Sequence, residues 1–280
     1  MKVAIVGYGF VGKALNNALK KEVEIIKIDP LLETSLKDLV SFEPDFIFLC
    51  LPTPMCDDGS QDISILENVF HEISSHNITG NIILKSTVTP DNLLMLSKYS
   101  DFILNPEFLR EKNADTDFIN GEIILFGGES KLCQEASNFY LDFTKCKQKE
   151  HFITDKISAS LIKYSINSFL ATKVIFFNQL KTLLDKSESN ISWKDFINII
   201  STDKRIGDSH MDVPGHDGRE GFGGACFPKD ISALEKFASS KGFDFSIIKQ
   251  VIKTNNQIRS VYNDLTKRES DQNITFKEEK

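Results

Sequence analysis

The first 29 residues follow an order of elements that few folds accommodate. The apolar run at residues 3–6 is typical of a strand buried on both faces of a parallel sheet. Three glycines follow it, and residues 13–20 then have the apolar spacing of a helix. A second strand-like run, residues 23–28, is followed by Asp29. This order predicts the first unit of a doubly wound α/β sheet.

The three glycines have the spacing G-x-G-x-x-G. In a dinucleotide site the first glycine allows the tight turn, the second lets the pyrophosphate approach, and the third lets the helix pack on the strand. Asp29 can accept hydrogen bonds from a ribose diol, and its charge would repel a 2′-phosphate, so NAD is favoured over NADP. The alternative is a doubly wound fold whose first turn binds nothing. The predicted cofactor-binding residues are Gly7, Gly9, Phe10, Val11, Gly12, Asp29, Thr53 and Thr87.

Strand-like runs alternate with helical ones up to about residue 155. This alternation predicts an NAD-binding domain of the Rossmann type at residues 1–155, with a mainly parallel sheet. Ligands bind such sheets beyond the carboxyl ends of the strands. Thr53, Thr87 and Glu107 each follow a strand-like run, so we expect them to face one shared crevice. Each could instead be an ordinary turn or cap residue.

The second half of the chain has a different pattern. Residues 157–186 form one helical stretch without Gly or Pro. At 1.5 Å per residue it spans about 45 Å, more than a small domain can cover, so one face is expected to pack on a second subunit. Further helices are expected at residues 193–201, 231–241 and 245–267. The prediction is an all-α dimerisation domain at residues 156–268 with the long helix at its centre. A polar tail at residues 269–280 follows. Together with Arg268 it is charged and has little to bury, so it is predicted to be disordered.

Composition and charge argue against several classes of protein. A net charge of −7 is unlike the basic surface of a nucleic-acid binder. No apolar run approaches the length of a membrane span, and the start with a strand predicts a protein without a signal peptide, in the cytoplasm. The 5 cysteines are odd in number and form no close C-x-x-C pair, so neither a disulfide framework nor a metal site is predicted.

Cys226 is the candidate nucleophile. It lies in the run Gly-Phe-Gly-Gly-Ala-Cys-Phe-Pro-Lys-Asp, residues 221–230. Glycines let a backbone approach a ligand closely, and the nearby cation of Lys229 favours the reactive thiolate. The segment is therefore predicted to be a mobile loop that presents a thiol. The alternative is a glycine turn before a helix, with Cys226 packed at the helix start as a small apolar residue.

Five motifs occur in the order found in nucleotide-sugar dehydrogenases, at residues 7–12, 86–88, 105–111, 205–207 and 221–230. On these motifs, residues 1–268 resemble that family, with the UDP-glucose 6-dehydrogenases closest and the GDP-mannose 6-dehydrogenases near them. The resemblance implies a double, NAD-dependent oxidation of a sugar C6 alcohol to a carboxylate, with UDP-glucose as the expected substrate. It also implies that Cys226 traps the aldehyde as a thiohemiacetal, which is oxidised to a thioester and hydrolysed.

The resemblance assigns roles to further residues. Lys163 and Asn167, four apart and so on one helix face, would stabilise negative charge on the sugar oxygen, as an oxyanion hole does. Asp230 would position or activate water, and Glu107 and Thr87 would order water and assist proton transfer. Without the resemblance, Lys163 reads equally as a surface lysine and Asn167 as a polar helix residue. Arg205 would reach the diphosphate of the nucleotide, either in its own subunit or in a partner subunit. The implied substrate-binding residues are Phe108, Leu109, Arg110, Glu111, Lys163, Asn167, Arg205 and Gly223.

The sequence also departs from the family pattern. Lys112 stands where many members have glycine, and the third domain, which holds much of the nucleotide in full-length members, has no counterpart here. The resemblance therefore implies a short form with a raised KM or a changed substrate, a partner chain that supplies the domain, or a poorly active remnant. Two other functions stay open. One is a two-electron β-hydroxyacid dehydrogenase, which needs no thiol, and the other is a non-catalytic NAD-binding partner subunit.

Overall fold

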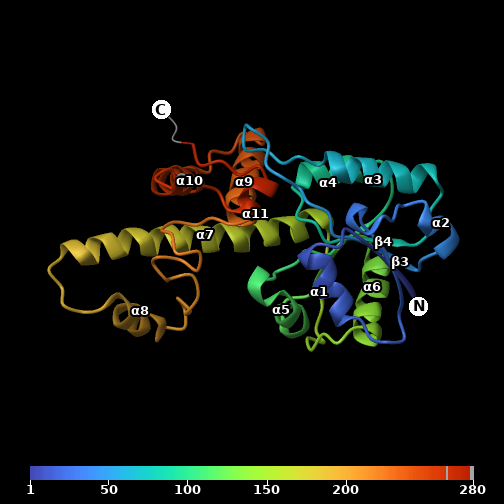
Figure 1. Ribbon diagram of the computed structural model, residues 1–280, viewed down its shortest axis with the longest axis horizontal. Helices are drawn as coiled ribbons and strands as arrows, with labels where there is room; N and C mark the ends of the chain where they lie inside the picture. Colours follow the sequence, from blue (N-terminus) through green and yellow to red (C-terminus); the bar gives the residue numbers. More distant parts are fainter. Residues whose placement is uncertain (263, 278–280) are drawn as a thin grey trace. The chain divides into compact units, whose positions relative to one another are not determined.

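The computed structural model describes residues 1–262 and 264–277, and the chain divides into two compact units. The first, called here the sheet unit, comprises Met1–Thr53 and Gln61–Lys163. The second, called the helical unit, comprises Pro54–Ser60 and Tyr164–Lys280. The sequence pattern places the division near residue 155, whereas the contacts place it after Lys163, inside the long helix. Figure 1 shows the order of the elements.

A seven-stranded sheet forms the centre of the sheet unit, in the order β2-β1-β3-β4-β5-β6-β7. Strands β1 to β5 are parallel, β6 is antiparallel to β5, and β7 is parallel to β6. The predicted mainly parallel α/β sheet is confirmed, although the short edge strand β7 is not anticipated by the sequence. The strands are β1 (Lys2–Val6), β2 (Glu24–Ile28), β3 (Phe46–Leu49), β4 (Asn81–Leu84), β5 (Ile103–Leu104), β6 (Leu125–Gly127) and β7 (Phe152–Thr154).

Helices cover both faces of this sheet, which is why its central strands are apolar throughout. Ala4 and Val6 of β1 belong to one core cluster, together with side chains of α2, α3 and α4. Val3 and Ile5 belong to the other, together with side chains of α1, α5 and α6. The helical segments are α1 (Phe10–Ala18), η1 (Pro30–Leu32), α2 (Asp38–Phe42), α3 (Ser64–Ser75), α4 (Pro90–Leu96), η2 (Glu111–Asn113), α5 (Ala114–Asn120) and α6 (Ser130–Phe143).

The strand order reverses between β1 and β3. The chain passes from β1 to β2 on one side, then returns to β3 on the other side of β1. At such a reversal the connections diverge and leave a crevice at the carboxyl ends of the strands, which is where ligands bind in doubly wound sheets. Backbone hydrogen bonds hold these ends level, from the Gly7 nitrogen to the Ile28 oxygen (2.9 Å) and from the Cys50 nitrogen to the Val6 oxygen (2.8 Å).

Five helices lie in the described part of the helical unit, and α7 is continuous from the sheet unit into it. Ala171 and Ile175 of α7 pack with Phe222 and with apolar residues of α9 and α10. A second cluster joins Phe177 of α7 to Ile197 of α8. The predicted long helix and the helical character of this half are confirmed. The helices are α7 (Lys156–Lys186), α8 (Trp193–Ser201), α9 (Phe227–Ser240), α10 (Ser246–Arg259) and α11 (Lys267–Asp271).

Two predictions for the C-terminal part are wrong. Helix α10 ends at Arg259 rather than near residue 267, and residues 268–277 are ordered around α11 instead of disordered. Thr266 caps α11 in a capping box with Glu269, and both Glu269 and Ile274 are 0% exposed. Composition misses this because two isolated residues, rather than an apolar pattern, anchor the segment. The predicted tail residues 278–280 lie outside the described residues.

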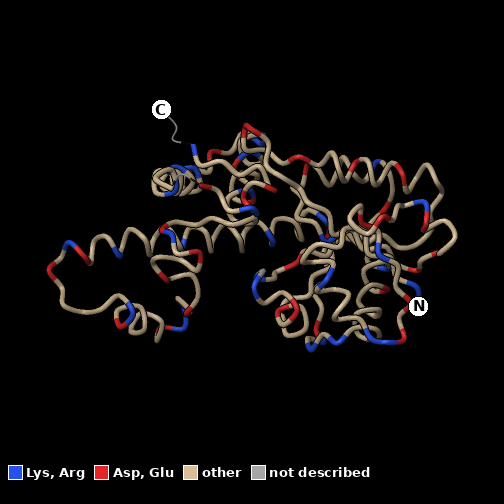
Figure 2. The backbone as a smooth tube through the Cα atoms, in the orientation of Figure 1, with Lys and Arg blue, Asp and Glu red and all other residues tan. Residues whose placement is uncertain are grey.

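Basic and acidic residues are interspersed along the chain (Figure 2). This mixture is unlike the clustered basic residues with which proteins bind nucleic acids. Among the helices that the structure describes, none combines the length and the apolar character needed to cross a membrane.

Candidate functional site

The turn after β1 requires glycine at two positions because backbones meet there. Gly7 has φ of +88°, and a Cβ on it would lie 2.5 Å from the carbonyl oxygen of Cys50. A Cβ on Gly12 would lie 2.3 Å from the carbonyl oxygen of Gly7. Neither oxygen can move without shifting a strand or the turn, so even alanine would disturb the packing of α1 against β1 and β3.

Gly9 lies at the N-cap of α1 for a different reason. Its φ is −75°, which any residue adopts, and a Cβ there would meet no heavy atom within 4 Å. The space in front of this helix end is therefore open. Phe10 and Val11 begin the helix, and the dipole and backbone N–H groups at a helix N-terminus favour an anion. This geometry fits the pyrophosphate of a dinucleotide.

Asp29 is held at the carboxyl end of β2 by two backbone donors. Its Oδ2 accepts a hydrogen bond from the Tyr8 nitrogen (2.7 Å), and its Oδ1 accepts one from the Leu31 nitrogen (2.9 Å). Each carboxylate oxygen keeps a lone pair, which a ribose hydroxyl could use. The fixed negative charge disfavours a 2′-phosphate. The residues present therefore fit NAD.

Thr53 and Thr87 follow neighbouring strands and are joined directly. The Thr53 Oγ1 donates to the carbonyl oxygen of Thr87 (3.1 Å), and Gln61 Nε2 donates to the same oxygen (2.7 Å). Both threonines are buried. The structure thus brings together two predicted cofactor-binding residues at the ends of β3 and β4.

Lys85, a buried lysine that no sequence motif marks, organises the next strand end. Lys85 Nζ donates to Asn105 Oδ1 (2.8 Å), and the Tyr140 hydroxyl donates to the same oxygen (2.6 Å). Asn105 Nδ2 donates to the carbonyl oxygen of Leu125 (2.9 Å). Burial is the main cause that lowers the pKa of Lys85. The network fixes the chain just before Glu107; a lysine that ends an apolar run is the only sequence signal for it.

Lys163 and Glu107, two predicted catalytic residues, form a buried ion pair. Lys163 Nζ donates to the backbone oxygen of Glu107 (2.5 Å) and lies 3.6 Å from its Oε1. Their side chains are 4% and 9% exposed. The lysine also lies over the Phe108 ring, and Glu107 Oε2 accepts a hydrogen bond from the Leu109 nitrogen (2.6 Å). Lys163 is therefore no surface lysine, and Phe108 and Leu109 are half-buried beside this pair.

Asn167 and Asp230 meet inside the helical unit. Asn167 Nδ2 donates to Asp230 Oδ2 (2.6 Å), while Lys229 Nζ pairs with Asp230 Oδ1 (2.5 Å). The Asp230 carboxylate is 1% exposed, yet each of its oxygens has a donor, which is the condition for burying such a charge. On α7, Asn167 lies one helical turn after Lys163.

Cys226 is the N-cap residue of α9 and is half-buried. Its carbonyl oxygen accepts a hydrogen bond from the Asp230 nitrogen (2.9 Å), which closes the first turn of the helix. Pro228 suits that turn because its φ is fixed. A helix N-terminus favours a thiolate. The geometry matches the glycine turn before a helix, but the thiol is not packed away in a core.

Side chains bond the backbone of the glycine segment before Cys226, which the sequence predicts to be a mobile loop. The Gly221 nitrogen donates to Asn178 Oδ1 (2.9 Å). Asn255 makes two hydrogen bonds to Phe222, accepting from its nitrogen (2.7 Å) and donating to its oxygen (3.0 Å). The sequence gives no signal for either asparagine, since a single polar residue in a helix belongs to no pattern.

The two arginines predicted to bind substrate are exposed and paired with neighbouring carboxylates. Arg110 pairs with Asp117 (2.7 Å), and Arg205 pairs with Asp203 (2.5 Å). The Arg110 hydrogen bond is the main cause that lowers the pKa of Asp117. Each arginine would have to exchange its partner for a phosphate to take the predicted role. The side chain of Glu111 lies outside the part of the chain that the structure describes.

Comparisons with known proteins agree with this geometry. Two domain models of one family match, the NAD-binding domain at residues 31–144 and the central domain at residues 157–257 of the UDP-glucose/GDP-mannose dehydrogenase family. A putative UDP-glucose 6-dehydrogenase of Bacillus subtilis is 30% identical over 307 residues, covering 94% of this chain and 69% of the relative. The chain belongs to the UDP-glucose/GDP-mannose dehydrogenase family.

Other members of the UDP-glucose/GDP-mannose dehydrogenase family give the same result. A UDP-glucose 6-dehydrogenase of Rickettsia felis is 36% identical over 220 residues, which cover 75% of this chain and 47% of the relative. The chain thus spans about half the length of the first such relatives it matches. A UDP-glucose dehydrogenase structure from Pyrobaculum islandicum, 24% identical, has a TM-score of 0.72 over 91% of this chain and 68% of its own, and supports the fold.

The chain contains the NAD-binding domain of the family, although that match begins only at residue 31. The glycine turn and Asp29 lie before the matched region. The case for their part in the NAD site therefore depends on the geometry described above. Gly9 leaves open space at the start of α1, and the Tyr8 nitrogen holds Asp29 at the end of β2.

Proposed function

We propose that this protein oxidises the C6 alcohol of a nucleotide sugar to the carboxylate, with NAD as oxidant and UDP-glucose as the expected substrate. The buried hydrogen bond between Asn167 and Asp230 carries the proposal. It ties α7, which also bears Lys163, to the first turn of α9, which Cys226 caps. A domain that only bound NAD would have no need of a buried acid held beside a helix-capping thiol.

The chemistry divides one difficult oxidation into steps that a thiol can carry. Bound NAD would accept a hydride in each of the two oxidations. The first converts the alcohol to an aldehyde. The Cys226 thiolate then forms a bond to the aldehyde carbon, and the sugar oxygen takes up a proton to give a thiohemiacetal. After the second oxidation the product is a thioester, whose C–S bond breaks when water attacks, releasing the carboxylate and the thiol.

The other residues supply charge and proton transfer. Lys163 and Asn167 stabilise negative charge on the sugar oxygen during these steps, because a cation and an amide donor act strongly where water is excluded. Glu107 keeps Lys163 paired at 3.6 Å and, with Thr87, orders water. Asp230 accepts a proton from the water that attacks the thioester, since it is a buried carboxylate one turn from Cys226.

The proposal is tested by counting the NADH formed per molecule of UDP- or GDP-sugar. Two NADH per sugar, with acid as product, are expected. In Cys226→Ser we expect no acid but unchanged NAD binding, while Cys56→Ser, which removes another half-buried thiol, should behave as the unmodified protein does. One NADH per substrate in both proteins would favour the β-hydroxyacid alternative. NAD binding without turnover, alone or mixed with a cognate chain, would favour the non-catalytic partner subunit.

We also propose that the protein forms a homodimer through α7. Phe169, Phe176 and Leu183 are spaced by seven residues, so they lie along one face of the helix. Their exposed fractions are 68%, 59% and 62%. Large apolar side chains aligned in this way normally mark a surface that a partner covers, and a second copy of the same helix presents a matching row.

A further inference from the structure

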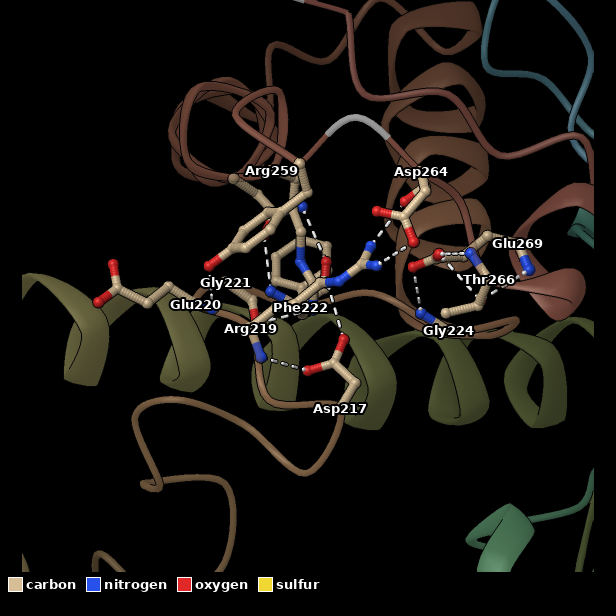
Figure 3. Close-up of polar contacts among 12 residues, drawn as sticks. Asp217, Arg219, Glu220, Gly221, Phe222, Gly224, Arg259, Asp264, Thr266 and Glu269 are labelled. Atoms are coloured by element: carbon tan, nitrogen blue, oxygen red, sulfur yellow. Dashed lines mark hydrogen bonds and ion pairs between the residues drawn. The ribbon is translucent and has the colours of Figure 1, made fainter.

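The glycine segment Gly221–Gly224, which leads to Cys226, lies outside regular secondary structure. Its backbone groups must therefore find other partners. Besides the two asparagines already described, residues from the end of the chain bond to both of its ends. Arg259 Nη2 donates to the Gly221 oxygen (3.2 Å), and Glu269 Oε1 accepts from the Gly224 nitrogen (3.0 Å). Figure 3 shows both side chains pointing to this segment.

Glu269 is fixed on its other side as well. Its Oε2 accepts hydrogen bonds from the nitrogen and the hydroxyl of Thr266 (2.7 and 2.9 Å), as part of the capping box of α11. The side chain is 0% exposed. A carboxylate with this many donors is held in one orientation, so its second oxygen stays directed at the Gly224 nitrogen.

Arg259 is held with comparable rigidity. It is 2% exposed, and its Nη1 lies 2.7 Å from Asp217 Oδ2. The rings of Tyr262 and Phe276 lie 5.9 and 5.8 Å from its guanidinium carbon. A buried cation with a paired carboxylate and flanking rings has little freedom to move, so the hydrogen bond to Gly221 is made from a fixed position.

Gly223 shows how closely these side chains approach the backbone. A Cβ on Gly223 would lie 2.3 Å from Glu269 Oε1 and 2.8 Å from the guanidinium carbon of Arg259. The two side chains therefore occupy the space that a side chain at this position would need. Packing therefore requires glycine at this position, and the substrate contact that the resemblance implies for it stays a prediction. Only Ala225 separates Gly224 from Cys226.

We infer that Arg259 and Glu269 are positioning residues, which clamp the glycine segment and thereby fix Cys226 at the start of α9. The expected effect on catalysis rests on the proposed function. A nucleophile must be placed within a fraction of an ångström of the carbon that it attacks. The clamp thus connects the C-terminal segment to the position of the thiol. Loss of the Glu269 hydrogen bond would free the backbone of Gly224, and Cys226 two residues later would move with it.

The test compares Glu269→Ala with Thr266→Ala. Both variants break the capping box of α11, but only the first removes the hydrogen bond to Gly224. In Glu269→Ala we expect iodoacetamide to alkylate Cys226 severalfold faster, by peptide mass spectrometry, and kcat to fall about a hundredfold. In Thr266→Ala the backbone nitrogen still donates to Glu269 Oε2 and keeps that carboxylate in place, so both quantities should stay within about twofold. Glu269→Gln, which keeps one acceptor oxygen, should be intermediate. Equal alkylation rates in the two alanine variants would overturn the inference.

A second measurement needs no variant. Hydrogen exchange of the unmodified protein should show the Gly224 amide protected to the same degree as amides inside α9, and fast exchange there would contradict the clamp. NAD affinity should be unchanged in all three variants, which controls for folding. Alkylation and exchange require no substrate. The clamp can therefore stand if no nucleotide sugar is turned over, and it can fail while Cys226-dependent turnover is observed.

Discussion

The amide of Asn167 on α7 donates a 2.6 Å hydrogen bond to the buried carboxylate of Asp230 on α9. The second oxygen of this carboxylate pairs with Lys229. An acid in the first turn of a helix is favoured by the helix dipole, but a buried one also needs donors at both oxygens. This pair therefore stabilises the start of α9 and presents a polar group of α7 at the same place.

Removing the amide should destabilise the protein, because the Asp230 carboxylate would be left with one donor fewer in a buried place. We expect Asn167→Ala to lower the free energy of unfolding by about 1–3 kcal/mol, measured by urea denaturation. Ser165→Ala on the same helix is the control, since Ser165 is exposed and its loss should change stability by less than about 0.5 kcal/mol. Equal losses in the two variants would show that the hydrogen bond contributes nothing specific.

Gly9 and Gly12 should respond to alanine in opposite ways. Gly9→Ala adds a Cβ to open space, so we expect unchanged thermal stability without NAD, but an NAD affinity about tenfold weaker or worse, equivalent to roughly 1.4 kcal/mol. Gly12→Ala drives a Cβ against a backbone oxygen and should cost about 1–3 kcal/mol of stability. Calorimetric titration measures the NAD affinity, and thermal melts measure the stability of each variant. Full NAD affinity in a folded Gly9→Ala would exclude the pyrophosphate from this helix end.

Phe176→Glu should convert the proposed dimer to a monomer, because a charge at the centre of the apolar row on α7 would be buried without a partner on dimerisation. Light scattering after gel filtration gives the mass directly. Thr182→Glu, at an exposed position on a different face of the same helix, should leave the mass unchanged. A monomeric unmodified protein, or a dimeric Phe176→Glu, would contradict the proposed interface.

Acid should weaken the C-terminal clamp through Asp217. Burial alone would raise the pKa of Asp217, but the hydrogen bond and charge of Arg259 outweigh it and lower that pKa. The native state then binds fewer protons than the unfolded state. The stabilisation is therefore complete above the unfolded pKa of about 3.9 and is lost as the pH falls through the native value.

The corresponding experiment measures urea stability of Asp217→Asn from pH 7 to pH 3. The variant should be less stable than the unmodified protein at pH 7, and the difference should shrink below pH of about 4. Asp264→Asn is the matched control, because Asp264 pairs with Arg219 at the surface, where its side chain is 81% exposed and such pairs contribute little. A difference that stays constant with pH would exclude the ion pair as its origin.

Local patterns predict much of this protein because they repeat along the chain. The order of β1, α1 and β2, the long α7 and the helix over Trp193–Ser201 follow from apolar periodicity and from the absence of Gly and Pro. The resemblance to the family likewise predicts functional roles for Lys163, Asn167 and Asp230. What these patterns lack is any indication of which polar groups are buried together, so the ion pair of Lys163 with Glu107 appears only in the structure.

The amino-acid sequence by itself determined the doubly wound sheet, the helical second half, the presence of an NAD-binding domain and the family. Tertiary structure alone decided that Lys85, Asn255, Arg259 and Glu269 are buried, and that a polar C-terminal segment is ordered against the glycine segment before Cys226. The physical reason is that a repeated apolar pattern predicts which face of an element is buried. A lone charged side chain, in contrast, is buried only when distant backbone groups supply its hydrogen bonds. Those groups come together only when the chain has folded.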